Sequence, residues 1–227
     1  ACIVLGLALQ PVRARWDFDR DRSARFADRP FAGVALVWRD VILRRIALMS
    51  FCYSLAQVCL TTFLVTLLVE EAEFALVAAG FVLALVQAAS VGGRLFWGWA
   101  ADRIGRGLAL LAALGLMTAV CSLAVAGLTQ VLGAGLLVAL FVVFGFAAVG
   151  WNGVYLAEVA RIAGVRAGEA TGGSLVVTFA GVLVGPALFS LIVPAIGGYA
   201  AAFAAVAAVA LIGVAFVRMA EAPRSPP

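Results

Sequence analysis

Residues 98–106 read GWAADRIGR and form a short charged segment between two long apolar runs. The run before it, residues 74–93, and the run after it, residues 108–128, contain no charged side chain. Each run has about the 20 residues that a helix needs to cross the hydrocarbon core of a bilayer. The segment therefore predicts a connection between two membrane spans at one membrane surface.

The composition of the whole chain agrees with a membrane protein. Of 227 residues, 65% are hydrophobic and 12% are charged, about half the charged share that is usual in soluble domains. This excludes an ordinary soluble domain and a disordered chain. We expect an all-α membrane protein whose bundle, residues 46–218, has six spans. These spans are Ile46–Val69, Phe74–Gly93, Leu108–Leu128, Leu132–Leu156, Gly172–Val193 and Tyr199–Val217.

The ends of the chain differ from the bundle in composition. Residues 1–10 are apolar but too short to span, and we interpret them as the end of a truncated transmembrane helix. Residues 11–45 carry 14 of the 28 charged residues and predict a linker. Within it, residues 31–45 are more apolar and indicate a short interfacial helix on the membrane surface. Residues 219–227 predict a tail.

The arginines give the expected topology. They lie before the first run and after the second, fourth and sixth, whereas the other connections carry only Glu70, Glu71 and Glu73 or no charge. Because basic residues are retained on the cytoplasmic side, the linker and the C-terminus are predicted to be cytoplasmic. The expected location is the inner (plasma) membrane of a bacterial-type cell, and the surrounding partner is the lipid bilayer.

The residue types present exclude several kinds of chemistry. All 16 basic residues are Arg, so a Ser-His-Asp triad, a His-ligated zinc site and a lysine Schiff base are impossible. We expect no catalytic residue, no metal, no cofactor and no nucleic-acid partner, and hence no enzyme. The cysteines lie inside apolar runs without Cys-x-x-Cys spacing, which favours packing roles. They are Cys2, Cys52, Cys59 and Cys121.

The segment 98–106 resembles the signature loop of the major facilitator superfamily of secondary transporters, G-x-x-x-D-R-x-G-R. Its position after the second of six spans, behind a charged linker, resembles the C-terminal half of such a protein. The resemblance extends over the whole chain and implies half of a twelve-helix fold. It also implies transport of a small-molecule substrate by alternating access, with a missing N-terminal six-helix half as partner.

The residues of this signature have expected roles in gating. Gly98 permits close helix packing, and Gly105 permits a turn with positive φ. Asp102 can cap a helix N-terminus. Arg103 and Arg106 can pair with acids at neighbouring helix ends.

Glu158, at the end of the fourth span, is such an acid. The resemblance implies that it pairs with an arginine of the signature loop. It can also pair locally with Arg161, three residues later on the same helix face. We favour a small network that includes Arg106.

The fifth span contains Gly172, Gly181, Gly185 and Pro186. This spacing resembles most of an antiporter signature that some family members carry in their fifth helix, although the final paired glycines are absent. The alternative interpretation is close packing of small residues with a proline kink.

Polar residues on one arc of the first span indicate the substrate cavity. Ser50, Tyr53, Ser54, Gln57 and Thr61 lie within about 100° of one another around a helix. Such an arc faces other helices or a cavity, because polar groups are costly against lipid. The cavity candidates are Tyr53, Gln57, Thr61, Gln87 and Asn152, with packing between helices as the alternative.

Two further features bear on function. Arg94 lies eight residues before Asp102 and can reach either the cytoplasmic surface or the cavity. No Asp, Glu or Lys lies in the middle of a span, so the acid of a proton relay would belong to the missing half.

A membrane-embedded enzyme and a non-transporting receptor or assembly subunit are the alternatives to a transporter. The sequence does not identify the substrate.

Overall fold

The structure, a computed structural model, describes residues 31–221. The expected truncated helix at residues 1–10, the linker up to residue 30 and the last six residues of the tail lie outside the described residues. The chain divides into two units, residues 1–31 and 32–227, and the description below concerns the second.

The described residues form helices joined by short connections, which confirms the all-α fold class. A 3-10 turn, Gly164–Arg166, joins α7 to α8. The helices are α2 (Ala32–Arg39), α3 (Val41–Glu70), α4 (Leu76–Ile104), α5 (Gly107–Leu128), α6 (Ala134–Ala148), α7 (Trp151–Ala163), α8 (Ala167–Ile196) and α9 (Gly198–Glu221).

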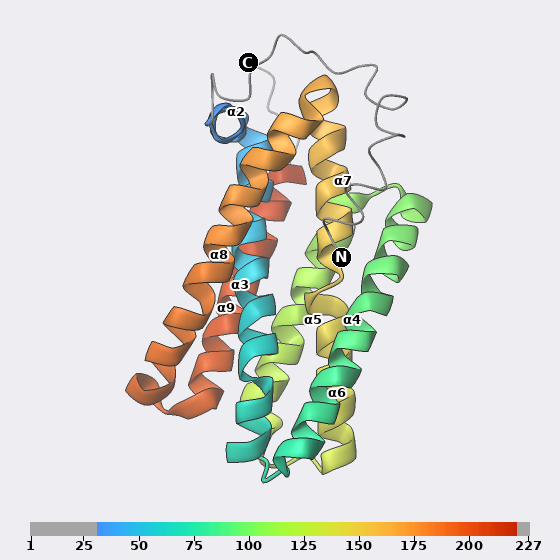
Figure 1. Ribbon diagram of the computed structural model, residues 1–227. Helices are drawn as coiled ribbons and strands as arrows, with labels where there is room; N and C mark the ends of the chain where they lie inside the picture. The colour runs from blue at the N-terminus through green and yellow to red at the C-terminus, as the bar shows by residue number, and fades with distance from the viewer. Residues whose placement is uncertain (1–30, 222–227) are drawn as a thin grey trace, which may run out of the picture. The chain divides into compact units, whose positions relative to one another are not determined.

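The described helices α3, α4, α5, α6 with α7, α8 and α9 run along the bundle (Figure 1). Among the described residues, five helical stretches are long and apolar enough to span a membrane, and one of them, Ala134–Ala195, has 62 residues and contains α6, α7 and α8. With 15 and 13 residues, α6 and α7 are each shorter than one crossing. They follow one another in the same direction and make one pass, and α8 returns. The predicted fourth span, Leu132–Leu156, therefore contains an irregular turn, called the break below, at residues 149–150, whose φ and ψ stay right-handed helical.

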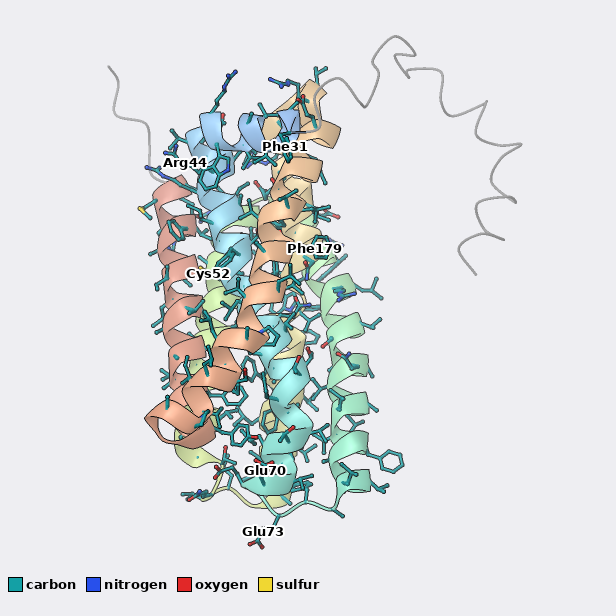
Figure 2. All side chains as sticks on the ribbon, turned by 60° about the vertical axis from the view of Figure 1, so that its left-hand side comes forward. Phe31, Arg44, Cys52, Glu70, Glu73 and Phe179 are labelled. Carbon is teal, nitrogen blue, oxygen red and sulfur yellow. The ribbon has the colours of Figure 1, made fainter. Side chains whose placement is uncertain are left out.

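The two ends of the bundle differ in charge, because one end carries arginines together with acids and the other carries acids alone. Figure 2 shows Arg44 at one end and Glu70 and Glu73 at the other. The α4–α5 and α7–α8 connections, which carry arginines, lie at the same end as α2 (Figure 1). Successive connections therefore lie at alternate ends of the bundle, as the distribution of the arginines in the sequence predicts.

The expected interfacial helix at residues 31–45 is two helices with a corner at Asp40. The Asp40 carboxylate accepts hydrogen bonds from the backbone nitrogens of Ile42 and Leu43 at 2.8 and 3.0 Å, and so caps the N-terminus of α3. The first span consequently begins at Val41 rather than Ile46. The separate helix α2 crosses α8 closely, because an added Cβ at Gly173 would lie 2.1 Å from the carbonyl oxygen of Gly33.

The second span is longer than the apolar run that predicted it. Helix α4 continues to Ile104, so most of the signature segment is helix end rather than loop. The helix ends at Gly105, whose φ of 66° is left-handed, as predicted, and whose N–H donates to the Ala101 carbonyl. Charges mark the membrane surface, but a helix can extend beyond it.

The core lies between helices that meet through small residues. Helix α5 packs on α9, α3 packs on α8 and α9, and α4 packs on α6. Cys52, Cys59 and Cys121 are buried and free, which confirms their expected packing roles, and Cys2 lies outside the described residues.

Candidate functional site

The break in the fourth pass lies beside a polar cluster formed by Gln57, Trp151 and Asn152. Gln57 Oε1 accepts hydrogen bonds from Trp151 Nε1 at 3.1 Å and from Asn152 Nδ2 at 3.0 Å. Trp151 is the first residue of α7 and is buried, whereas Gln57 and Asn152 are partly exposed. Within residues 31–221, the Nε2 group of Gln57 has no hydrogen-bond partner. The cluster therefore joins α3 to α7 and keeps one amide donor available.

Side chains of α4 stabilise the backbone at this break. Trp97 Nε1 donates to the carbonyl oxygen of Phe146 at 3.0 Å. Ser90 Oγ donates to the Val86 carbonyl at 2.7 Å and lies 3.2 Å from the Gly145 carbonyl oxygen. The Phe146 and Gly145 carbonyls belong to the last turn of α6, and the Gly145 carbonyl also accepts from the Val149 N–H at 3.2 Å. An added Cβ at Gly150 would lie 2.3 Å from Trp97 Cδ1, so the indole packs directly on the break. The break is thus held by contacts from another helix.

Tyr53, unlike Gln57 and Asn152, is buried between helices. Its ring is buried, its hydroxyl donates to the Leu111 carbonyl at 3.0 Å, and an added Cβ at Gly115 or Gly213 would overlap it. It also contacts the Trp151 ring edge-on, with centroids 5.8 Å apart. The prediction of Tyr53 as a cavity residue conflicts with these contacts, because glycines on α5 and α9 make room for its ring between the helices.

Other polar residues of α3 also bind neighbouring helices. Ser50 Oγ and Thr178 Oγ1 share a hydrogen bond of 2.8 Å, and Ser54 Oγ donates to the Thr178 carbonyl at 2.8 Å. The packing alternative is therefore correct for this part of the predicted arc. Thr61 is half-buried and donates to its own helix at the Gln57 and Val58 carbonyls.

The structure brings together some of the cavity candidates. Gln57 and Asn152 are in contact, and Thr61 lies one turn from Gln57 on α3. Gln87 is exposed on α4. Two buried hydroxyl oxygens, Tyr155 Oη and Ser174 Oγ, each lack a hydrogen-bond partner among the described residues.

The signature segment contacts little within the described residues. An added Cβ at Gly98 would meet no atom within 4 Å among the described residues, so the close packing expected there stays a prediction. Asp102 is exposed and does not cap α5, which begins without a side-chain cap, so the expected capping role stays a prediction. Arg103 lies over the Trp99 ring at 5.5 Å instead of pairing with an acid.

Glu158 pairs locally rather than with the signature segment. Its carboxylate accepts from Arg161 Nε at 3.0 Å and also from Arg161 Nη2. The favoured network with Arg106 is absent from the ion pairs of residues 31–221. However, an added Cβ at Gly107 would lie 2.2 Å from Glu158 Oε1, so the carboxylate covers the first turn of α5. A negative charge there is stabilised by the helix dipole.

Glycines of α8 support the packing interpretation of the fifth span. An added Cβ would lie 2.3 Å from the Phe51 carbonyl oxygen at Gly181 and 3.1 Å from the Leu55 carbonyl oxygen at Gly185. Gly172 meets no atom within 4 Å, and its neighbour Gly173 makes the contact with α2. Pro186 lies inside α8 and cannot donate to the carbonyl four residues earlier.

Sequence reasoning missed the residues that act through another helix. The sequence did not indicate that Trp97 and Ser90 contact α6. It also did not indicate that the Glu158 carboxylate packs against Gly107. The clustering of Gly145, Gly150 and Gly153 was the available signal for an irregular fourth span.

Among the described residues, no group of three His, Cys, Asp or Glu could hold a metal ion.

Comparisons with known proteins agree with this architecture. The family model described as Major Facilitator Superfamily matches residues 1–172 and residues 46–227, each more than half of the chain. A solved structure of a point variant of the E. coli fucose:proton symporter FucP is similar, with a TM-score of 0.72 and 17% sequence identity. The similarity covers 89% of this chain and 49% of that one, so this chain spans about half the symporter's length. The comparison with curated proteins gives no match.

Proposed function

Because this multi-pass membrane chain belongs to the major facilitator superfamily, we propose that it is the C-terminal half of a secondary active transporter. The family match across the chain carries this proposal. A second six-helix half completes the protein, and the two halves rock about a central site to expose a small solute to each side in turn. The half-length match to the fucose:proton symporter supports this division.

The cluster at the break in the fourth pass is the proposed substrate wall of this half. Discontinuous helices are where transporters commonly bind their substrates. Gln57 offers an unused amide donor, and Asn152 lies at the N-terminal end of α7 beside it. Thr61 and Gln87 are further candidates, on α3 and α4.

The proposed gating elements are at the Arg-rich end. Glu158 holds α7 against the first turn of α5, directly after the signature segment. Asp102 and Arg106 are exposed in this half and have no ion pair within residues 31–221. They are available for contacts with the other half in one of the two conformations.

The proposed location is the inner (plasma) membrane, with the Arg-rich end in the cytoplasm. The support is the separation of the arginines from Glu70, Glu71 and Glu73 and the preference of basic residues for the cytoplasmic side. The proposed mechanism involves no covalent chemistry, so the protein acts as a carrier rather than as an enzyme, a receptor or an assembly subunit.

The proposal is tested by solute flux into vesicles that contain the full-length protein. Labelled lactate, succinate, fucose and tetraethylammonium cover anionic, neutral and cationic solutes. We expect at least one to enter faster than into protein-free vesicles, and Asp102→Asn to slow that entry at an equal protein level. Glu221→Gln, an acid that pairs with Arg218 at the end of α9, is the matched control. The absence of flux for all four solutes would contradict the proposal. Normal flux in the Asp102→Asn variant would show that the signature segment only anchors the helix ends at the membrane surface.

A further inference from the structure

Arg94 places a positive charge inside the apolar length of α4. It precedes the end of the helix, Ile104, by ten positions, or about 15 Å of helix. The run before it, residues 74–93, has no charge. Arg94 is exposed, and within residues 31–221 it forms neither an ion pair nor a hydrogen bond. An unpaired charge in a membrane span is costly and is retained where a partner or a water-filled cavity compensates it.

The outer surface of α4 has two unlike flanks. At 100° per residue, the first flank lies within about 60°; it contains the exposed apolar residues Phe81, Leu85, Phe96 and Trp99, together with Gly92 and, at the helix end, Arg103. The second lies within about 40° on the opposite side; it contains Gly80, Gln87, Arg94 and Gly98, with the exposed Leu76 at its outer end. Lipid suits the apolar flank, whereas small and polar residues suit a helix interface or a cavity.

The second flank has no partner in the described chain. An added Cβ at Gly80 or Gly98 would meet no atom within 4 Å. Only 28% of the most apolar part of α4 is buried, against 56% for α3. Within the transporter proposed above, the flank that carries Arg94 therefore faces the other half and the space between the halves.

The charges of this half leave Arg94 without a counter-ion at its depth. The described acids lie near the helix ends, and Asp102, the nearest along α4, is eight residues away and about 80° around the helix. Gln87 lies two turns from Arg94 on the same flank and is a neutral donor and acceptor. The flank therefore combines one fixed cation with one amide.

We propose that Arg94 binds the carboxylate of a small organic anion, and that the transported substrate is such an anion. The inference rests on the proposed function and specifies its substrate class. A guanidinium matches a carboxylate with two parallel hydrogen bonds, and it keeps its charge in an apolar setting. Gln87 contacts a second polar group of the same solute.

The test is binding of lactate and succinate to the purified full-length protein, followed by thermal unfolding. Lactamide and succinamide are the uncharged controls, and sodium chloride controls for ionic strength. We expect the two carboxylates, and not the amides or chloride, to raise the melting temperature. Arg94→Gln should raise the half-saturating concentration about ten- to hundredfold. Arg94→Lys should give an intermediate value, because it keeps the charge without the planar fork.

A matched variant separates this effect from a general loss of charge. Arg218→Gln removes an exposed arginine at the end of α9, where it pairs with Glu221, and should bind lactate as the unmodified protein does. Equal anion binding by the protein and by Arg94→Gln would overturn the assignment. So would stabilisation by the amides, or no stabilisation of the unmodified protein by either carboxylate.

Two further results distinguish the alternatives. If anionic phospholipid stabilises the protein through Arg94 while lactate and succinate do not, Arg94 serves a lipid headgroup and the substrate assignment is wrong. If fucose or tetraethylammonium is transported and Arg94→Gln leaves that flux unchanged, the anion assignment fails while the transporter proposal stands. The melting temperature of each variant without ligand shows whether it is folded.

Discussion

Trp97 donates its indole N–H to the carbonyl oxygen of Phe146, 3.0 Å away, across the contact between α4 and α6. The same indole packs on Gly150, where the fourth pass is interrupted. One side chain of α4 thus both satisfies a carbonyl at the end of α6 and fills the space beside the break. The break is consequently part of the packing of the bundle and not a local irregularity.

Replacing Trp97 by Phe should destabilise the bundle by about 1 kcal/mol, because the Phe146 carbonyl loses its donor in a membrane interior. Trp99→Phe is the matched control. Trp99 is 56% exposed, and its replacement should change stability by less than about 0.5 kcal/mol. Unfolding of the purified full-length protein in mixed micelles measures both. Equal effects of the two substitutions would show that the hydrogen bond contributes nothing.

Adding a methyl group at Gly150 should destabilise the protein by about 1–3 kcal/mol, because the new Cβ would overlap Trp97 Cδ1 and the Phe146 carbonyl. Gly153→Ala, three residues later in α7, meets open space and should be neutral or slightly stabilising. Thermal unfolding of the two variants compares the same chemical change in two surroundings. A fully stable Gly150→Ala variant would mean that the break rearranges freely.

The contact between Gly107 and Glu158 predicts coupling between two substitutions. Gly107→Ala should displace the Glu158 carboxylate, whose Oε1 lies 2.2 Å from the new Cβ. In Glu158→Ala the same change should cost less, so a double-mutant cycle should give a coupling of about 0.5–3 kcal/mol. Additive effects would contradict the placement of the carboxylate over α5. Gly168→Ala, in open space near the start of α8, controls for the glycine replacement itself.

Gln57 should contribute to both stability and substrate affinity. Gln57→Ala removes the acceptor of Trp151 and Asn152 and the free Nε2 donor, so it should lower stability by about 0.6–1.7 kcal/mol and also raise KM. Trp151→Phe removes one donor to Gln57 but leaves Nε2, so it should lower stability and raise KM less than Gln57→Ala does. If Gln57→Ala lowers stability and leaves KM unchanged, Gln57 only joins the helices and does not contact substrate.

The sequence was sufficient to predict the number and order of the passes. Runs of about 20 apolar residues separated by alternating basic and acidic or neutral connections leave little choice in a membrane. The boundaries were less accurate, because α3 and α4 extend beyond their apolar runs to Val41 and Ile104. Apolar length reports the thickness of the membrane, whereas helix length also depends on caps such as Asp40 and Gly105.

The candidate site was predictable only in part. Periodicity indicated that one arc of α3 is polar, but it could not indicate what lies opposite each residue. Tyr53 meets Gly115 and Gly213, which are more than 60 residues away in sequence, and is therefore buried between helices. The break at residues 149–150 depends on Trp97 in the same way. Such contacts arise from tertiary packing and leave no local pattern.

The central claim, alternating access to a cavity that borders this half, is tested most directly by labelling a single cysteine at Gln87. The full-length protein without its native cysteines carries Gln87→Cys, and an impermeant thiol reagent is added to either side of oriented vesicles. Glu71→Cys should react only from outside and Arg166→Cys only from the cytoplasmic side. We predict that Gln87→Cys reacts from both sides, because the cavity opens to each in turn. Reaction from one side alone, or from neither, would contradict the account.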